Sequence, residues 1–166
     1  MSEPGNSSYS RDEIVFRTCQ LVVRHIRNHV EEKRGGIHSR LFSHVLHPET
    51  EFVLIGHSPE ALASPKDQWH LEHIVPCTAL IVHTRRLIEE GRLPDDEISR
   101  LLQRHWKVAF ITKKQAKHLD YELKLQWGMP ADWDYETGDT LKRLELGGIT
   151  IQRTSMAAAQ LLGEQS

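Results

Sequence analysis

Apolar side chains recur every three or four positions between residues 11 and 33, which is the spacing of one face of an α-helix. Ser10 and Glu13 stand just before this pattern, three residues apart, as in a capping box in which each side chain accepts a hydrogen bond from the other residue's backbone N–H. Gly35 and Gly36 follow the pattern and are expected to end it. The sequence therefore predicts a long N-terminal helix over about residues 11–33, with an apolar stripe of Val15, Cys19, Val22, Ile26 and Val30.

Two shorter patterns follow in the first half of the chain. Residues 52–55 form a wholly apolar run that is stopped by Gly56, and such a run predicts a buried strand. The periodicity of residues 69–75 fits either a helix or a strand, and Pro76 limits its continuation.

The third apolar run, residues 106–111, is rich in β-branched and aromatic side chains and predicts another strand. It leads directly into Thr112 and Gln115, a second capping-box pair, so a helix is expected to start at once and to continue to about residue 126.

Helical patterns account for most of the remaining chain. They are bounded by prolines and glycines, as helix ends commonly are. With so few strands, the fold class is predicted to be a helix-dominated α+β single domain. The further helices are expected at residues 78–90, from Pro94 onward, at 140–146 and at 155–162.

The composition is that of a soluble globular protein, with 166 residues, 39% hydrophobic and 27% charged. No apolar run approaches the roughly 18 residues that a membrane span needs, and the polar N-terminal stretch does not suit a signal peptide. Two cysteines are too few for a disulfide framework, which favours a reducing, cytoplasmic location. The unusual count is histidine, at 11.

Basic side chains gather in one segment although the net charge of the chain is −2. Residues 100–124 hold seven basic and two acidic side chains, a local charge of +5 inside an otherwise acidic molecule. Such a segment is either a solvated helix face or a contact for phosphate groups, and nucleic acid is the expected partner in the second case. The candidate contacts are Arg104, Lys107, Lys113, Lys114 and Lys117.

The densest chemical constellation is His70-Leu71-Glu72-His73, followed by Cys77. His73 can act as a general base, because the imidazole pKa lies near neutral pH, with a divalent cation bound to Glu72 or a neighbour. Alternatively His70, His73 and Cys77 are zinc ligands, for which a fourth ligand is missing from the sequence. A nucleophilic Cys77 would need a third group to orient His73, and the sequence shows none. The residues can also be plain surface side chains.

Residues 72–76, Glu-His-Ile-Val-Pro, resemble the acidic-His-Ile-x-Pro signature of the HNH (His-Me finger) nucleases. The resemblance extends to the strand and helix at residues 106–122, although about thirty residues separate the two parts and the asparagine typical of the motif has no counterpart. It implies a ββα unit around one divalent ion, Mg²⁺ or Mn²⁺ with Zn²⁺ as an alternative. It further implies His73 as the general base, Glu72 as a metal ligand, and His118 or Asp120 as the ligand on the helix. His70, two residues before Glu72, is a further candidate metal ligand.

The resemblance thus predicts an HNH-like endonuclease that acts on DNA or RNA. The alternative is a non-catalytic cytosolic protein of phage or mobile-element type that binds nucleic acid or a nucleic-acid-processing partner, with a structural zinc site as an option. The expected organisation is a flexible stretch over residues 1–9 and a single domain over 10–166, made of the N-terminal helix (10–34), a ββα-like core with a helical insertion (52–126) and a C-terminal segment (127–166).

Overall fold

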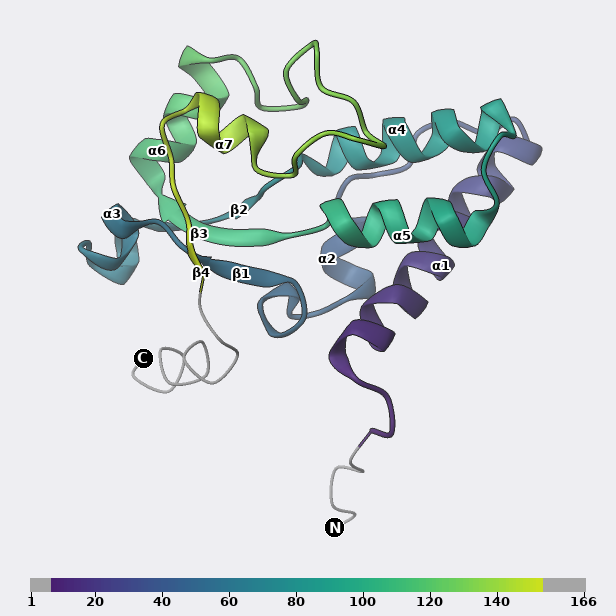
Figure 1. Cartoon of the computed structure of the whole chain (residues 1–166), viewed down its shortest axis with the longest axis horizontal. Coiled ribbons are helices and arrows are strands. Elements are labelled where there is room, and N and C mark those ends of the chain that lie inside the picture. Colours follow the sequence, from purple (N-terminus) through teal and green to yellow (C-terminus); the bar gives the residue numbers. More distant parts are fainter. Residues whose placement is uncertain (1–6, 154–166) are drawn as a thin grey trace.

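Helix α1 (Arg11–Glu31) confirms the first prediction in the computed structural model, which describes residues 7–153 (Figure 1). The Ser10 hydroxyl accepts a hydrogen bond from the Glu13 backbone N–H at 3.2 Å, and the Ser10 N–H donates to the Glu13 carboxylate at 2.7 Å. Most of the apolar stripe is buried. Residues 1–6 and the helical pattern expected at 155–162 lie outside the described residues.

Four short strands form one mixed sheet in the order β2-β3-β1-β4. Strand β3 lies in the middle, antiparallel to β2 and parallel to β1, and β4 is antiparallel to β1. The segment that fitted either a helix or a strand is therefore a strand. The bounds are β1 (Leu54–His57), β2 (Trp69–His73), β3 (Val108–Thr112) and β4 (Gln152–Arg153).

Both strands predicted from apolar runs begin two residues later than expected. Gly56 does not stop β1 but lies within it, where it pairs with Ala109 and Arg153. A Cβ atom at this position would lie 2.0 Å from the carbonyl oxygen of Gln152, so the approach of β4 requires glycine there. Trp106 does not belong to β3; it caps the helix before it, and its side chain is fully buried.

The helix expected from residue 112 to about 126 is wrong in length. Its capping box is present, but the α-helix α6 ends at Lys117 and a π-helical turn, η3, follows it. The wider turn keeps Leu119 buried, and the chain then leaves the helical path at Lys124, which has a φ of +57°. The helical elements besides α1 are α2 (Leu41–Val45), η1 (Glu49–Glu51), α3 (Pro59–Leu62), η2 (Lys66–Gln68), α4 (Cys77–Glu90), α5 (Asp95–His105), α6 (Lys113–Lys117), η3 (His118–Glu122) and α7 (Lys142–Leu146).

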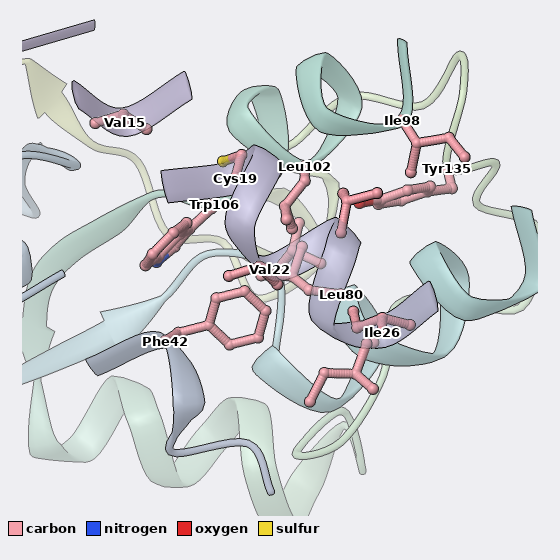
Figure 2. Packing of buried hydrophobic residues seen from close by; sticks show 14 of the residues in the cluster. Val15, Cys19, Val22, Ile26, Phe42, Leu80, Ile98, Leu102, Trp106 and Tyr135 are labelled. Atoms are coloured by element: carbon pink, nitrogen blue, oxygen red, sulfur yellow. The ribbon is translucent and has the colours of Figure 1, made fainter. Parts of the chain in front are cut away.

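The sheet separates two hydrophobic clusters. The larger one lies among α1, α2, α4 and α5 and one face of the strands (Figure 2). The smaller one lies on the other face, under α6, η3 and α7. Successive residues of a strand point to opposite faces, so Val108 joins the larger cluster and Ala109 the smaller. The helix-dominated α+β prediction is confirmed, and each sheet face is covered by helices.

Candidate functional site

Strand β2 divides the predicted motif between the two faces of the sheet. Glu72 bonds to Arg143 of α7 on the face of the smaller cluster. The imidazole of His73 bonds instead to the carboxylate of Glu49 in η1. Pro76, which was expected to limit the continuation of residues 69–75, is the residue before α4 and does not bring Glu72 and His73 to the same face. The two adjacent side chains therefore have separate partners.

Glu72 lies in a buried ion pair. Arg143 is 1% exposed, and its Nη2 donates to the Glu72 carboxylate and, at 2.8 Å, to the His73 carbonyl oxygen. His70 Nε2 lies 3.1 Å from the same carboxylate. Burial raises the pKa of Glu72, but His70 and Arg143 outweigh it and hold the pKa below its ordinary value. The other terminal nitrogen of Arg143, Nη1, is buried and has no hydrogen-bond partner among the described residues.

Asp120 of η3 belongs to the same electrostatic group. Burial and the nearby charge of Glu72 raise the pKa of Asp120, and the hydrogen bond to Glu72 and the charge of Asp120 raise the pKa of His70. Three of the four predicted metal ligands therefore influence one another on this face. As they stand, no three His, Cys, Asp or Glu side chains among residues 7–153 are arranged to hold a metal ion. The fourth, His118, bonds through Nδ1 to Glu122 at 2.6 Å.

His73 belongs to a second polar group, on the other face. Its Nε2 lies 2.8 Å from Oε2 of Glu49, and Trp106 Nε1–H donates to the same oxygen at 2.8 Å. The pKa of His73 is lowered by burial, but interactions with Cys77 and Glu49 outweigh burial and raise it to about 10. Both neighbours therefore favour the protonated form of the imidazole. The third group that a Cys77–His73 pair needs is Glu49, which no sequence pattern indicated.

Of the zinc ligands considered from the sequence, the structure brings His73 and Cys77 together, whereas His70 bonds to Glu72 on the other face. The predicted nucleic-acid contacts also divide. Lys113, Lys114 and Lys117 are exposed on α6, where the helix begins directly at the end of β3. Arg104 and Lys107 line a cavity near the other end of β3.

The two cysteines are expected to differ strongly in reactivity. Cys19 is fully buried, and burial raises its pKa to about 12, whereas Cys77 is partly exposed beside His73. Because the thiolate is the reactive form, iodoacetamide should alkylate Cys77 first in the folded chain, by at least about a hundredfold in rate. Mass spectrometry of peptides after timed quenching measures both rates, and equal rates would contradict the burial of Cys19. Urea-unfolded protein is the control, in which the two rates should converge.

Comparisons with protein-family models, curated proteins and solved structures found no match for this chain. Within residues 7–153, no helix combines the length and the apolar composition needed to cross a lipid bilayer.

Proposed function

We propose that the chain is a metal-dependent, HNH-like endonuclease that hydrolyses phosphodiester bonds of DNA or RNA. The observation that supports this most is the ββα unit made by β2, β3 and α6. The two strands pair antiparallel from Trp69 with Thr112 to His73 with Val108, and α6 contacts both strands. The motif of Glu72 and His73 ends the first strand of this unit, as the resemblance implies.

His70, Glu72 and Asp120 are the residues that would hold the divalent ion. Carboxylate oxygens and an imidazole suit Mg²⁺, Mn²⁺ or Zn²⁺. Burial raises the pKa of Asp120 most, and repulsion from the Glu72 carboxylate raises it further; a cation between the two carboxylates would relieve this repulsion. Because Glu72 is already paired, the cation would replace Arg143 as its counter-ion. When bound, such an ion stabilises negative charge on the phosphate and on the leaving oxygen.

His73 is the proposed general base. It would take a proton from the attacking water as the water oxygen bonds to phosphorus and the bond from phosphorus to the leaving oxygen breaks. An imidazole can accept that proton only in its neutral form. Glu49 and Cys77 favour the protonated form, and His73 lies on the opposite face of the sheet from Glu72. Hydrolysis therefore requires the end of β2 to rearrange when substrate and cation bind, so that the imidazole leaves Glu49 and Cys77 and reaches the water beside the ion.

The test is cleavage of plasmid DNA and of single-stranded RNA with Mg²⁺ or Mn²⁺. Loss of a general base typically lowers the rate by about 10² to 10⁴ fold, so His73→Gln should show this loss and Glu72→Gln should require more metal. His44→Gln, which changes an exposed imidazole on α2, is the matched control and should cleave like the wild type. Equal cleavage by wild type and His73→Gln would overturn the proposal.

The alternative is a protein that keeps this scaffold without the chemistry and binds nucleic acid or a nucleic-acid-processing partner. The pairing of Glu72 with Arg143 favours it, because the guanidinium already neutralises the carboxylate that would bind the ion. No cleavage by the wild type, together with no thermal stabilisation by Mg²⁺, Mn²⁺ or Zn²⁺, would support this alternative against the nuclease.

A further inference from the structure

A cavity of about 560 Å³ lies on the molecule outside both polar groups of the candidate site. It opens where the end of α5, the start of β3, strand β4 and the loop at 137–141 meet. Its volume is within the range of roughly 300–1,000 Å³ typical of small-molecule sites. Three cationic side chains line it: Arg104, Lys107 and Arg153.

Three positive charges face one carboxylate, Asp139, in the lining of this cavity. None of the ion pairs found in the part of the chain that the structure describes includes Arg104, Lys107 or Arg153. Within residues 7–153, Lys107 donates its one hydrogen bond to the Gln103 carbonyl oxygen, at 2.8 Å. Burial lowers the pKa of Lys107 most; Cys19 and Asp12 act in the opposite direction, and the charges of Arg11 and Arg153 lower the pKa further. Like charges are thus held together around an open space, and an anion placed there would relieve their repulsion.

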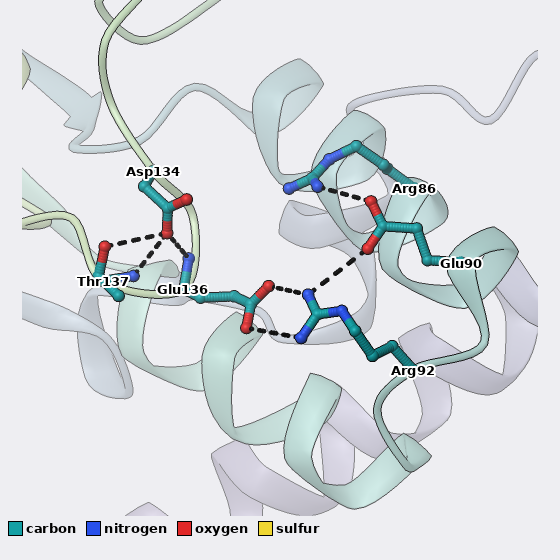
Figure 3. A network of polar contacts seen from close by, with 6 residues as sticks. All are labelled: Arg86, Glu90, Arg92, Asp134, Glu136 and Thr137. Carbon is teal, nitrogen blue, oxygen red and sulfur yellow. Dashed lines mark hydrogen bonds and ion pairs between the residues drawn. The ribbon is translucent and has the colours of Figure 1, made fainter.

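The loop that supplies residues 137–141 of the cavity lining is held in place by ion pairs and hydrogen bonds of the residues just before it. Figure 3 shows a chain of ion pairs in which Arg86 binds Glu90, Glu90 binds Arg92, and Arg92 binds Glu136. Asp134 closes the turn by accepting from the backbone N–H groups of Glu136 and Thr137 at 2.9 Å.

Arg104 lines the cavity and also bonds to this loop. Its two terminal nitrogens donate to the carbonyl oxygens of Glu136 and Gly138, both at 3.2 Å. These acceptors orient the guanidinium but carry no full charge to cancel its own. Arg104 is therefore positioned before any ligand binds, which lowers the entropic cost of binding.

A carboxylate lines the same cavity. Asp139 Oδ1 accepts a hydrogen bond from the Leu141 backbone N–H at 2.8 Å, and Oδ2 makes no hydrogen bond among the described residues. A carboxylate beside three cations disfavours a bare anion. It favours a ligand that brings hydroxyl or amino donors together with its negative charge.

We infer that this cavity binds a nucleoside phosphate, with the phosphate between Arg104, Lys107 and Arg153 and a sugar hydroxyl or base amino group on Asp139. Guanidinium groups match phosphate oxygens with paired N–H donors, and ammonium groups add charge. The nucleoside phosphate is either a free nucleotide or one nucleotide of a strand. If the ligand is one nucleotide of a strand, the inference deepens the proposed function and rests on it, because the proposed function is what identifies the strand as DNA or RNA. It does not depend on hydrolysis.

Binding is tested with the full chain in EDTA, which removes divalent ions and so prevents hydrolysis. A failure of the proposed nuclease activity therefore cannot be mistaken for a failure of nucleotide binding. The probes are a fluorescein-labelled single-stranded DNA oligonucleotide, AMP and inorganic phosphate. The variant is Lys107→Gln/Arg153→Gln, and Arg40→Gln is the matched control because its side chain is exposed and does not line the cavity. We expect the double variant to bind the oligonucleotide about tenfold or more weakly at low salt, with a smaller salt dependence, and the control to bind like the wild type.

Competition by AMP identifies a free nucleotide as the ligand, whereas oligonucleotide binding that AMP does not reduce identifies a strand. A second measurement uses the wild type and therefore does not depend on the folding of a variant: acetylation of Lys107 should be slowed by the probe that binds, and acetylation of exposed Lys33 should not. The inference is overturned if the double variant binds like Arg40→Gln, if neither AMP nor the oligonucleotide protects Lys107, or if inorganic phosphate protects it as well as they do.

Discussion

Substitution of Arg143 by methionine is expected to lower the free energy of unfolding by about 3–5 kcal/mol, which is typical when one partner of a buried ion pair is removed. Methionine preserves much of the side-chain volume but leaves the Glu72 carboxylate buried without its guanidinium. The carbonyl oxygens of His73 and Ile74 also lose a donor. Urea denaturation at neutral pH followed by circular dichroism measures the loss.

Two further variants separate the charge effect from packing. Arg86→Met makes the same replacement in an exposed pair with Glu90, where a change below about 1 kcal/mol is expected. Arg143→Met/Glu72→Leu removes both buried charges, so most of the lost stability should return. A loss for Arg143→Met no larger than that for Arg86→Met would show that the buried pair contributes nothing specific.

Acid is expected to destabilise the protein through His105. This side chain is fully buried, with Nε2 at 2.8 Å from the Tyr135 carbonyl oxygen and Nδ1 at 2.9 Å from the Thr140 hydroxyl. A neutral imidazole satisfies both, since Nε2–H donates and Nδ1 accepts. Burial, and to a smaller extent the charges of Arg104 and Lys107, lower the pKa of His105 to about 4.

The direction of the effect follows from proton binding. Between about pH 6.5 and pH 4 the unfolded chain binds a proton at His105 that the folded chain does not, so the free energy of unfolding falls as pH falls. The full shift corresponds to about 3 kcal/mol. His105→Gln does not titrate and can still donate to Tyr135, so its stability should fall less over this range in urea denaturation. Carboxylates such as Glu72 contribute equally to both proteins, and parallel pH dependences would therefore refute the role of His105.

Local patterns predicted α1 and the capping boxes because the interacting residues are three or four positions apart. They failed where a partner is distant in the chain. Glu49 lies 24 residues before His73, in a segment without periodicity, and its contact exists because the fold places η1, which packs against β1, beside His73. Arg143 stands in a short, highly charged helix that looks solvated, yet it is buried because α7 packs against the sheet.

The excess of basic residues in the sequence pointed to two of the three cations that line the cavity but not to the third. Arg104 and Lys107 were both identified from the excess of basic residues in their segment. Arg153 was not, because it comes from a two-residue strand near the C-terminal end and reaches the cavity only through pairing of β4 with β1. Alternation along β2 explains why Glu72 and His73, adjacent in the motif, have different partners, since neighbouring strand residues point to opposite faces.

The position of α4 and α5 between β2 and β3 has a consequence for the order of folding. The strand pair closes on residues far apart in the chain, from His73 with Val108 to Trp69 with Thr112, so closing it as an open loop would cost considerable chain entropy. The intervening residues instead form two helices that pack against each other and against α1, and the buried side chains of all three helices belong to one hydrophobic cluster. We expect this helical hairpin to form early and to bring the strand ends together, which makes mutations in α4 and α5 slow folding while those in β4 mainly speed unfolding.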